Sequence, residues 1–427
     1  MQQVASQNAP SPFIVVPHFI IGAGIWLIIS ILIILSPDAF LAHYFNPKLL
    51  AITHLIVLGF ITMIIFGALY QLTPVIMELK LYSEKLAIIS LLMLVSGTLL
   101  LGFSFWNFLL GSIMYISAAL IVAAVILFAI NIFITGNRSS KNSIQKDFIL
   151  TSIIWLMFTV IAGTALAVNL TFPFLQAPHL ELLKLHSHAG IAGWFIQLII
   201  GVGSRLLPMF MVSHNLNEKK LKIAYYFING GLITGIVALF LLWEIGVVIA
   251  TISVVAGILC FISYIFEAYK KRIKKHLDIG MKQTFVSFLT FIIALILVLL
   301  LISETGWLKN ITERISMAYG VTLLIGFITS LIMGQTYKTL PFIIWLKVYR
   351  NKVGRGKIPL PKELYSEKAA TFQLWFFASG FFILLTGIIV SNAYLIRLGG
   401  IFLFLAILLY NYNLYKIVLH KAIVNEK

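Results

Sequence analysis

Charged residues are scarce in this chain. Only 11% of its 427 residues are Asp, Glu, Lys or Arg, whereas 61% are hydrophobic. Soluble domains carry about 25% charged residues, so the composition excludes an ordinary soluble protein. It indicates a polytopic membrane protein whose spans satisfy their own backbone hydrogen bonds by forming helices.

Cysteine is nearly absent, and the common nucleotide and protease motifs are missing. Cys260 is the single cysteine, which excludes intrachain disulfides, CxxC redox chemistry, thiolate metal clusters and a covalently attached c-type haem. The sequence contains no phosphate-binding loop, no HExxH and no GxSxG. Any metal or cofactor chemistry therefore depends on histidine, whose neutral imidazole is the commonest protein ligand for metals.

The most prominent feature of the sequence is a set of twelve apolar segments. Most are long enough to cross a hydrocarbon core of roughly 30 Å at about 1.5 Å per residue. We therefore predict an all-α polytopic membrane protein with twelve transmembrane helices. The segments lie near residues 13–35, 49–74, 86–106, 109–135, 148–170, 179–210, 222–243, 245–268, 283–303, 314–341, 367–390 and 393–415.

The net charge of +17 is distributed unevenly. With the N-terminus inside, 26 of the 31 Lys and Arg residues fall on the cytoplasmic side. The positive-inside rule then predicts a bacterial-type inner membrane protein with both termini in the cytoplasm. The basic run 269–276 is interpreted as a cytoplasmic loop beside anionic lipid, so we expect the lipid bilayer as partner and no nucleic acid. The first twelve residues carry no positive charge and do not resemble a signal peptide.

One sequence pattern occurs three times. Counted from His54, His188 and Val321, which lie 134 and 133 residues apart, five positions match in all three copies. They are glycine at +5 (Gly59, Gly193, Gly326), an aromatic residue at +6 (Phe60, Trp194, Phe327), glycine at +13 (Gly67, Gly201, Gly334), a long polar side chain at +17 (Gln71, Arg205, Lys338) and proline at +20 (Pro74, Pro208, Pro341).

Five matched positions in three copies indicate an internal triplication. We predict one integral membrane domain, residues 1–427, built from three four-helix repeats near 13–135, 148–268 and 283–415. The glycines at +5 and +13 share a helix face and are interpreted as sites where helices or a flat ligand approach closely. The polar residues at +17 are interpreted as side chains that reach the cytoplasmic headgroups. The alternative for Arg205 is to hold an acidic group such as a haem propionate.

Histidines mark the predicted outer ends of the first two copies. His54 and His188 are equivalent by the repeat, and His186 precedes His188 by two residues. We interpret these three as candidate ligands of haem iron or copper. His186 and His188 differ by about 200° around an α-helix, so they cannot face one small site together. The alternative is that each imidazole bonds a neighbouring carbonyl or hydroxyl.

Several other residues are secondary candidates or are assigned to the periphery. His179 shares a helix face with His186, and Tyr319 occupies the position of His186 in the third copy. His18 lies near the start of the first span and is interpreted as interfacial. His43 lies in the first outer loop and is interpreted as solvated.

With these residues, the chain resembles the haem–copper oxidase subunit I superfamily. The resemblance rests on the twelve helices, the three-by-four repeat and the phrase HSHAGIAGW…RLLPMF. It implies that His54 falls where the helix-2 ligand of the low-spin haem falls, and that His188 or His186 falls where a helix-6 copper ligand falls. The chain is also similar to short subunit I-like proteins and to NnrS-type haem- and copper-containing membrane proteins linked to nitric oxide tolerance.

The chain departs from this family in its ligand set. The helix-7 histidine pair is missing, the helix-10 region has Tyr319 and Val321, and no tyrosine follows the helix-6 histidines by four residues, where Gly190 and Ala192 stand. We therefore expect a divergent member with haem b, with copper or with no cofactor.

The resemblance implies a role in respiratory electron transfer or nitric oxide handling, with a redox subunit or electron donor as partner. If the protein is an enzyme, it is expected to be an oxidoreductase related to cytochrome c or quinol oxidase or to nitric oxide reductase. A complete proton-pumping oxidase is not expected. The alternative is a cofactor-free transporter or a structural or assembly partner on the same scaffold.

Overall fold

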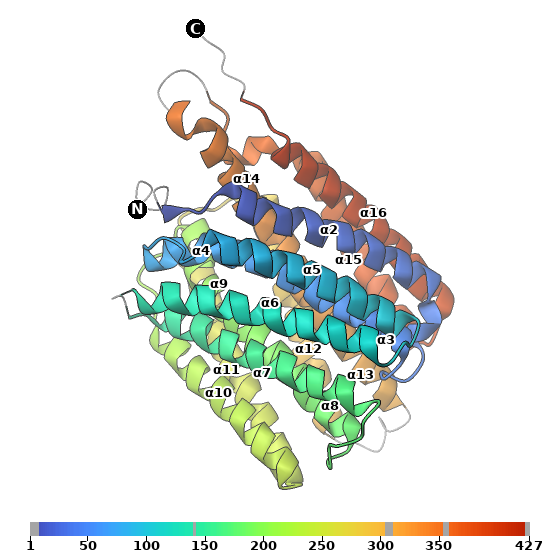
Figure 1. Cartoon of the computed structure of the whole chain (residues 1–427). Helices are drawn as coiled ribbons and strands as arrows, with labels where there is room; N and C mark the ends of the chain where they lie inside the picture. The colour runs from blue at the N-terminus through green and yellow to red at the C-terminus, as the bar shows by residue number, and fades with distance from the viewer. Residues whose placement is uncertain (1–7, 140–141, 304–310, 353–357, 423–427) are drawn as a thin grey trace. The chain divides into compact units, whose positions relative to one another are not determined.

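The computed structural model describes residues 8–139, 142–303, 311–352 and 358–422 (Figure 1). All regular elements in these ranges are helical, and twelve helices are long and apolar enough to cross a membrane. The predicted fold class is therefore confirmed. The words inner and outer below refer to the predicted orientation of the spans.

The spans in chain order, with the short helices between them, have the following bounds. They are α2 (Pro12–Leu35), η1 (Pro37–Phe40), α3–η2–α4 (Pro47–His54, Leu55–Thr62, Met63–Met77), α5 (Glu84–Trp106), α6 (Ser112–Asn137), α7 (Ile144–Asn169), α8–η3–α9 (His179–His188, Ala189–Ile196, Gln197–Met211), α10 (Lys219–Phe240), α11 (Glu244–Lys270), α12 (Ile279–Ile302), α13–η5–α14 (Thr312–Val321, Thr322–Thr329, Ser330–Tyr349), η6 (Arg350–Lys352), η7 (Pro361–Leu364), α15 (Glu367–Ile389) and α16 (Ala393–Val418).

The predicted span ends agree with these bounds to within four residues, with one exception. The tenth segment was expected to end at residue 341, but the helix runs through Pro341 and the span continues to Lys352. Proline is tolerated inside membrane helices, where neighbouring groups satisfy the freed carbonyl. The three +20 prolines are all helix-internal, since Pro74 and Pro208 also lie inside α4 and α9.

The chain divides into two compact units. Unit 1 comprises residues 1–75, 94–109 and 278–427, and unit 2 comprises 76–93 and 110–277, apart from the residues not described. In unit 1, α15 and α16 form a hairpin, and α16 also packs along α2 (Figure 1). The side-chain amide of Asn411 on α16 donates to the carbonyl of Ala23 on α2 over 3.3 Å.

Unit 2 contains the helices from α6 to α11, with α10 and α11 as its hairpin. A partly buried polar network joins three of its helices. The indole N–H of Trp155 on α7 donates to the Asn229 side chain on α10 over 2.9 Å. Asn229 also exchanges two hydrogen bonds, of 3.0 and 3.1 Å, with Gln197 on α9. Such interhelical polar contacts fix helix position inside a membrane.

The three signature helices share an irregularity at the same place. In each copy an α-helix ends at the zero position, positions +1 to +8 form a π-helix (η2, η3 and η5), and an α-helix resumes at +9. π-helical segments are rare in proteins. The recurrence of one at identical offsets is a structural counterpart of the sequence pattern, and the triplication itself stays a prediction.

The glycines of the pattern mark close contacts between helices. A Cβ on Gly67 would lie 2.6 Å from the Cβ of His18 on α2, and one on Gly201 would lie 2.9 Å from the Cβ of Phe148 on α7. A Cβ on Gly334 would lie 2.7 Å from the carbonyl oxygen of Gly280 on α12. In each copy the +13 glycine therefore lets the signature helix approach the first helix of the predicted repeat. The helix-approach interpretation is confirmed at these positions.

Candidate histidine sites and an outer pocket

His54 is the last residue of α3, immediately before η2. The side chain is half-buried, and its ring packs on Phe105 of α5 with 4.9 Å between centroids. Its Nδ1 lies 2.8 Å from the carbonyl oxygen of Leu50 one turn earlier. A carbonyl oxygen only accepts, so Nδ1 carries the hydrogen, and the neutral ring has its lone pair on Nε2.

His186 and His188 both lie on α8 but have different surroundings. His186 is half-buried, and its Nδ1 donates over 3.0 Å to the carbonyl of Thr159 on α7. Its ring fills the space beside Gly163, where a Cβ would lie 2.7 Å from the His186 Cε1. His188 is exposed, and its Nδ1 donates over 2.8 Å to the carbonyl of Lys184. The two imidazoles therefore serve separate sites.

All three histidines thus share one tautomer, whereas His179 has the other. The Asn169 side-chain oxygen accepts from the backbone N–H groups of Phe174 and Leu175, each over 2.9 Å, which fixes the orientation of that amide. Its amide nitrogen then donates to Nδ1 of His179 over 3.3 Å. The lone pair of neutral His179 is engaged in this bond, so His179 organises the 169–179 turn.

Each of these histidines fits a metal or haem iron that takes one imidazole ligand from this chain. Metal-ligating histidines usually donate one ring N–H to a carbonyl or carboxylate, which fixes the ring and leaves the other nitrogen for the metal. His54, His186 and His188 each make the first of these contacts, a bond from Nδ1 to a backbone carbonyl. Among the residues that the structure describes, no three His, Cys, Asp or Glu side chains gather into a group that could hold a metal ion. Haem iron needs only one or two protein ligands.

His54 belongs to unit 1, and His186 and His188 belong to unit 2. They are therefore described as separate sites. Tyr319 is half-buried on α13 in unit 1, and Arg205 is exposed on α9 in unit 2. Lys338, the third-copy counterpart of Arg205, forms an ion pair with Asp278 at the start of α12, with 2.5 Å between Nζ and the carboxylate.

His18 was expected at the membrane interface, but its side chain is enclosed within the protein. Its side chain is 0% exposed, because Gly67 lets α4 close over it and the ring of Tyr70 packs on its edge. Its Nδ1 donates to the carbonyl of Ile14 over 2.8 Å, so His18 shares the tautomer of His54. The covering contact comes from a segment about 50 residues away, which local hydropathy does not reveal.

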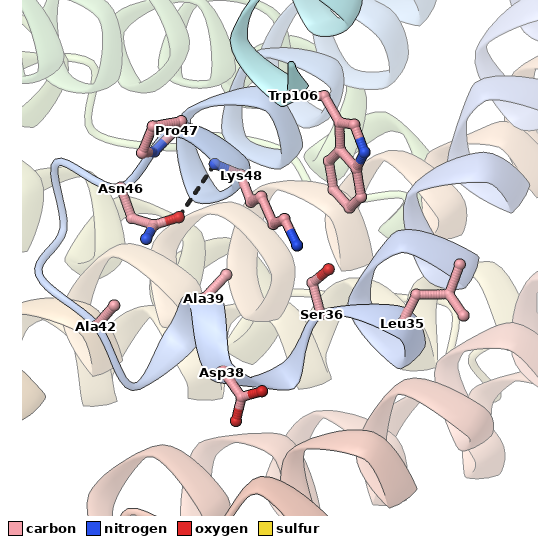
Figure 2. Close-up of a pocket in the computed structure, with 9 residues that line it drawn as sticks. All are labelled: Leu35, Ser36, Asp38, Ala39, Ala42, Asn46, Pro47, Lys48 and Trp106. Atoms are coloured by element: carbon pink, nitrogen blue, oxygen red, sulfur yellow. Dashed lines mark hydrogen bonds between the residues drawn. The ribbon is translucent and has the colours of Figure 1, made fainter. Parts of the chain in front are cut away.

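Unit 1 also has a pocket at its outer end, which the sequence did not indicate. Figure 2 shows this pocket between the end of α2, the start of α3 and Trp106 at the end of α5. Its volume is about 420 Å³, and its lining includes Asp38 and Lys48. The Lys48 ammonium lies 5.4 Å from the centre of the Trp106 ring. The sequence feature that could have pointed to this pocket is Lys48, because the predicted outer side has few lysines and arginines.

Comparison with known proteins identifies the scaffold. No protein-family model and no curated protein sequence matches the chain. The structure matches one chain of a haem–copper terminal oxidase dimer solved by cryo-EM, with a TM-score of 0.55 and 14% sequence identity. The match covers 97% of this chain and 85% of that one. The chain has the haem–copper oxidase fold.

This fold relation agrees with the subunit I resemblance in the sequence. It extends over nearly the whole chain and includes all three signature helices. At 14% identity the likeness concerns the scaffold, so what the oxidase binds belongs to the oxidase. The cofactor question for this chain depends on its own histidines.

Proposed function

We propose that this protein is a divergent subunit I-like member of the haem–copper oxidase superfamily. It holds a single haem b or a copper ion through His54 or through one of the two α8 histidines, and it acts in respiratory electron transfer or nitric oxide handling. A redox subunit or an electron donor is its expected partner. The triplicated four-helix arrangement is part of this proposal.

The observation that carries the proposal is the shared tautomer of the three histidines on this fold. At His54, the Leu50 carbonyl holds the Nδ1 proton and orients the ring, while Phe105 packs on the ring and limits water access. A haem iron or copper bound there would supply a one-electron redox couple. The chain's own residues position the imidazole and set its ligating nitrogen.

An absorption spectrum and a metal analysis of the detergent-purified protein test this. We expect a Soret band or stoichiometric copper, and its loss in His54→Ala or His188→Ala assigns the ligand. His43→Ala is the matched control, because this exposed loop imidazole uses Nδ1 to accept from the Phe45 N–H. A wild-type protein with neither a Soret band nor copper overturns the proposal.

The second candidate is a cofactor-free transporter or assembly partner on the same scaffold. One observation favours it: the ring of His186 bonds the Thr159 carbonyl and fills the space beside Gly163. Packing alone explains that contact. A wild-type protein with neither a Soret band nor copper, together with lower stability of His186→Ala, supports this second function.

A further inference from the structure

The outer pocket of unit 1 presents one positive and one negative group that are not paired with each other. Among the described residues, no ion pair joins Asp38 to Lys48, although both line the pocket. In Figure 2, Lys48 extends toward Ser36 and Trp106, whereas the carboxylate of Asp38 points the other way. The pocket therefore offers separate positions for an anion and a cation.

Ser36 adds a hydroxyl on the Lys48 side of the pocket. The residue is 6% exposed, and in the described part of the chain its hydroxyl makes no capping bond to η1. Figure 2 shows this hydroxyl directed toward the Lys48 ammonium. An anionic oxygen placed between the Lys48 ammonium and the Ser36 hydroxyl would bond both.

The position of Lys48 in its helix points the same way. It is the second residue of α3, where the positive end of the helix dipole disfavours a cation. Asn46 already accepts from the backbone N–H groups of Lys48 and Leu49, so the helix terminus is capped. An anion at the Lys48 ammonium would offset the unfavourable charge without needing the backbone donors.

The surroundings indicate a lipid rather than a freely diffusing ion. Trp106 ends a membrane span, and tryptophan side chains concentrate at the membrane–water interface. Leu35, at the end of α2, also lines the pocket and is 66% exposed. A headgroup in the pocket would leave its acyl chains beside this apolar side chain.

We propose that this pocket binds a zwitterionic phosphoethanolamine headgroup. Its phosphate oxygen lies at Lys48 and Ser36, and its ammonium lies at Asp38. The pocket's charges sum to zero, which matches a zwitterion and disfavours a lipid with only a negative headgroup. Free phosphoethanolamine shares this chemistry, so the test includes it.

Native mass spectrometry of the full chain in detergent measures lipid retention directly. Phosphatidylethanolamine and phosphatidylglycerol with identical acyl chains are the probes. We expect about fivefold stronger retention of phosphatidylethanolamine, a size that partly exposed charge pairs give. Asp38→Asn abolishes the preference, and Lys48→Met lowers retention of both lipids. Lys184→Met is the matched control, because this exposed outer lysine is paired with Glu181.

Equal retention of the two lipids by the wild-type protein overturns the proposal, as does an equal loss in Lys184→Met. Free phosphoethanolamine is then added to the lipid-bound protein. If it displaces the lipid, the headgroup alone is sufficient for binding. If the lipid is retained, the intact membrane lipid is the ligand. Tryptophan emission is a second readout. Addition of phosphatidylethanolamine shifts it in the wild-type protein, and Trp106→Phe removes that shift.

Discussion

Gly334→Ala tests a close helix contact in the third copy. A Cβ at Gly334 would lie 2.7 Å from the carbonyl oxygen of Gly280 and 3.2 Å from the backbone nitrogen of Thr284. Both atoms belong to the backbone of α12, so neither can swing aside as a side chain would. Accommodation requires α12 and α14 to separate.

The size of the effect follows from two opposing contributions. Overpacking a well-packed core costs about 1–3 kcal/mol, and replacing a helical glycine by alanine returns about 1 kcal/mol. Gly320→Ala on the same span is the matched control, because a Cβ there meets nothing within 4 Å. Both variants gain the same helix propensity from alanine. The difference between their free energies of unfolding therefore isolates the overpacking contribution of about 1–3 kcal/mol.

Thermal unfolding of both variants in one detergent at a fixed scan rate measures the difference. We expect Gly334→Ala to unfold at a lower temperature than Gly320→Ala, and Gly320→Ala to match or exceed the wild-type protein. Gly67→Ala and Gly201→Ala should resemble Gly334→Ala, since each would also press on the neighbouring helix. If Gly334→Ala is as stable as Gly320→Ala, the inference of backbone contact is wrong.

Three further predictions concern polar groups. Lys338→Met leaves the Asp278 carboxylate without its ion pair, in which the two side chains are 15% and 19% exposed. We expect the free energy of unfolding to fall by about 1–3 kcal/mol in denaturant titrations, and the added substitution Asp278→Asn to restore most of it. Asn229→Leu removes the bonds to an indole and an amide, and should lower stability by about 1–2 kcal/mol in the same assay, with retained stability counting against the network. Burial, with a smaller contribution from the Lys416 charge, holds the pKa of His420 below its ordinary value. As pH falls below about 6.5, His420 takes up a proton in the unfolded chain before it does so in the folded protein. The free energy of unfolding should therefore decline below this pH, and it should decline less in His420→Gln.

The twelve spans were predictable because length and hydropathy decide whether a segment can cross a bilayer. The one large error, the end of the tenth span at Pro341, has a specific cause. Proline ends helices in water, but inside α14 it is accommodated. The fold class needed nothing beyond this, and the subunit I resemblance rested on the twelve helices, the three-by-four repeat and the phrase HSHAGIAGW…RLLPMF.

The environments of the histidines were less predictable. The bond from His54 to Leu50 is local and follows from helix geometry, whereas the bond from His186 to Thr159 joins residues 27 apart. Hydropathy also cannot separate buried faces from lipid-facing ones, because lipid is as apolar as leucine. His18 was interpreted as interfacial because it lies near the start of the first span, and hydropathy gave no sign that Gly67 and Tyr70 enclose it.

The π-helical segments explain why two glycines eight residues apart face the same neighbour in every copy. In a regular α-helix such residues differ by about 80° after two turns. A π turn closes its hydrogen bond at i+5, so each residue advances less around the axis and the offset shrinks. Position +5 lies inside the π segment and +13 beyond it, and in the third copy both Gly326 and Gly334 contact α12. The corresponding pairs contact α2 and α7. π segments often mark functional sites, but this one occurs in all three copies, including the copy without histidine, so its presence does not depend on a histidine.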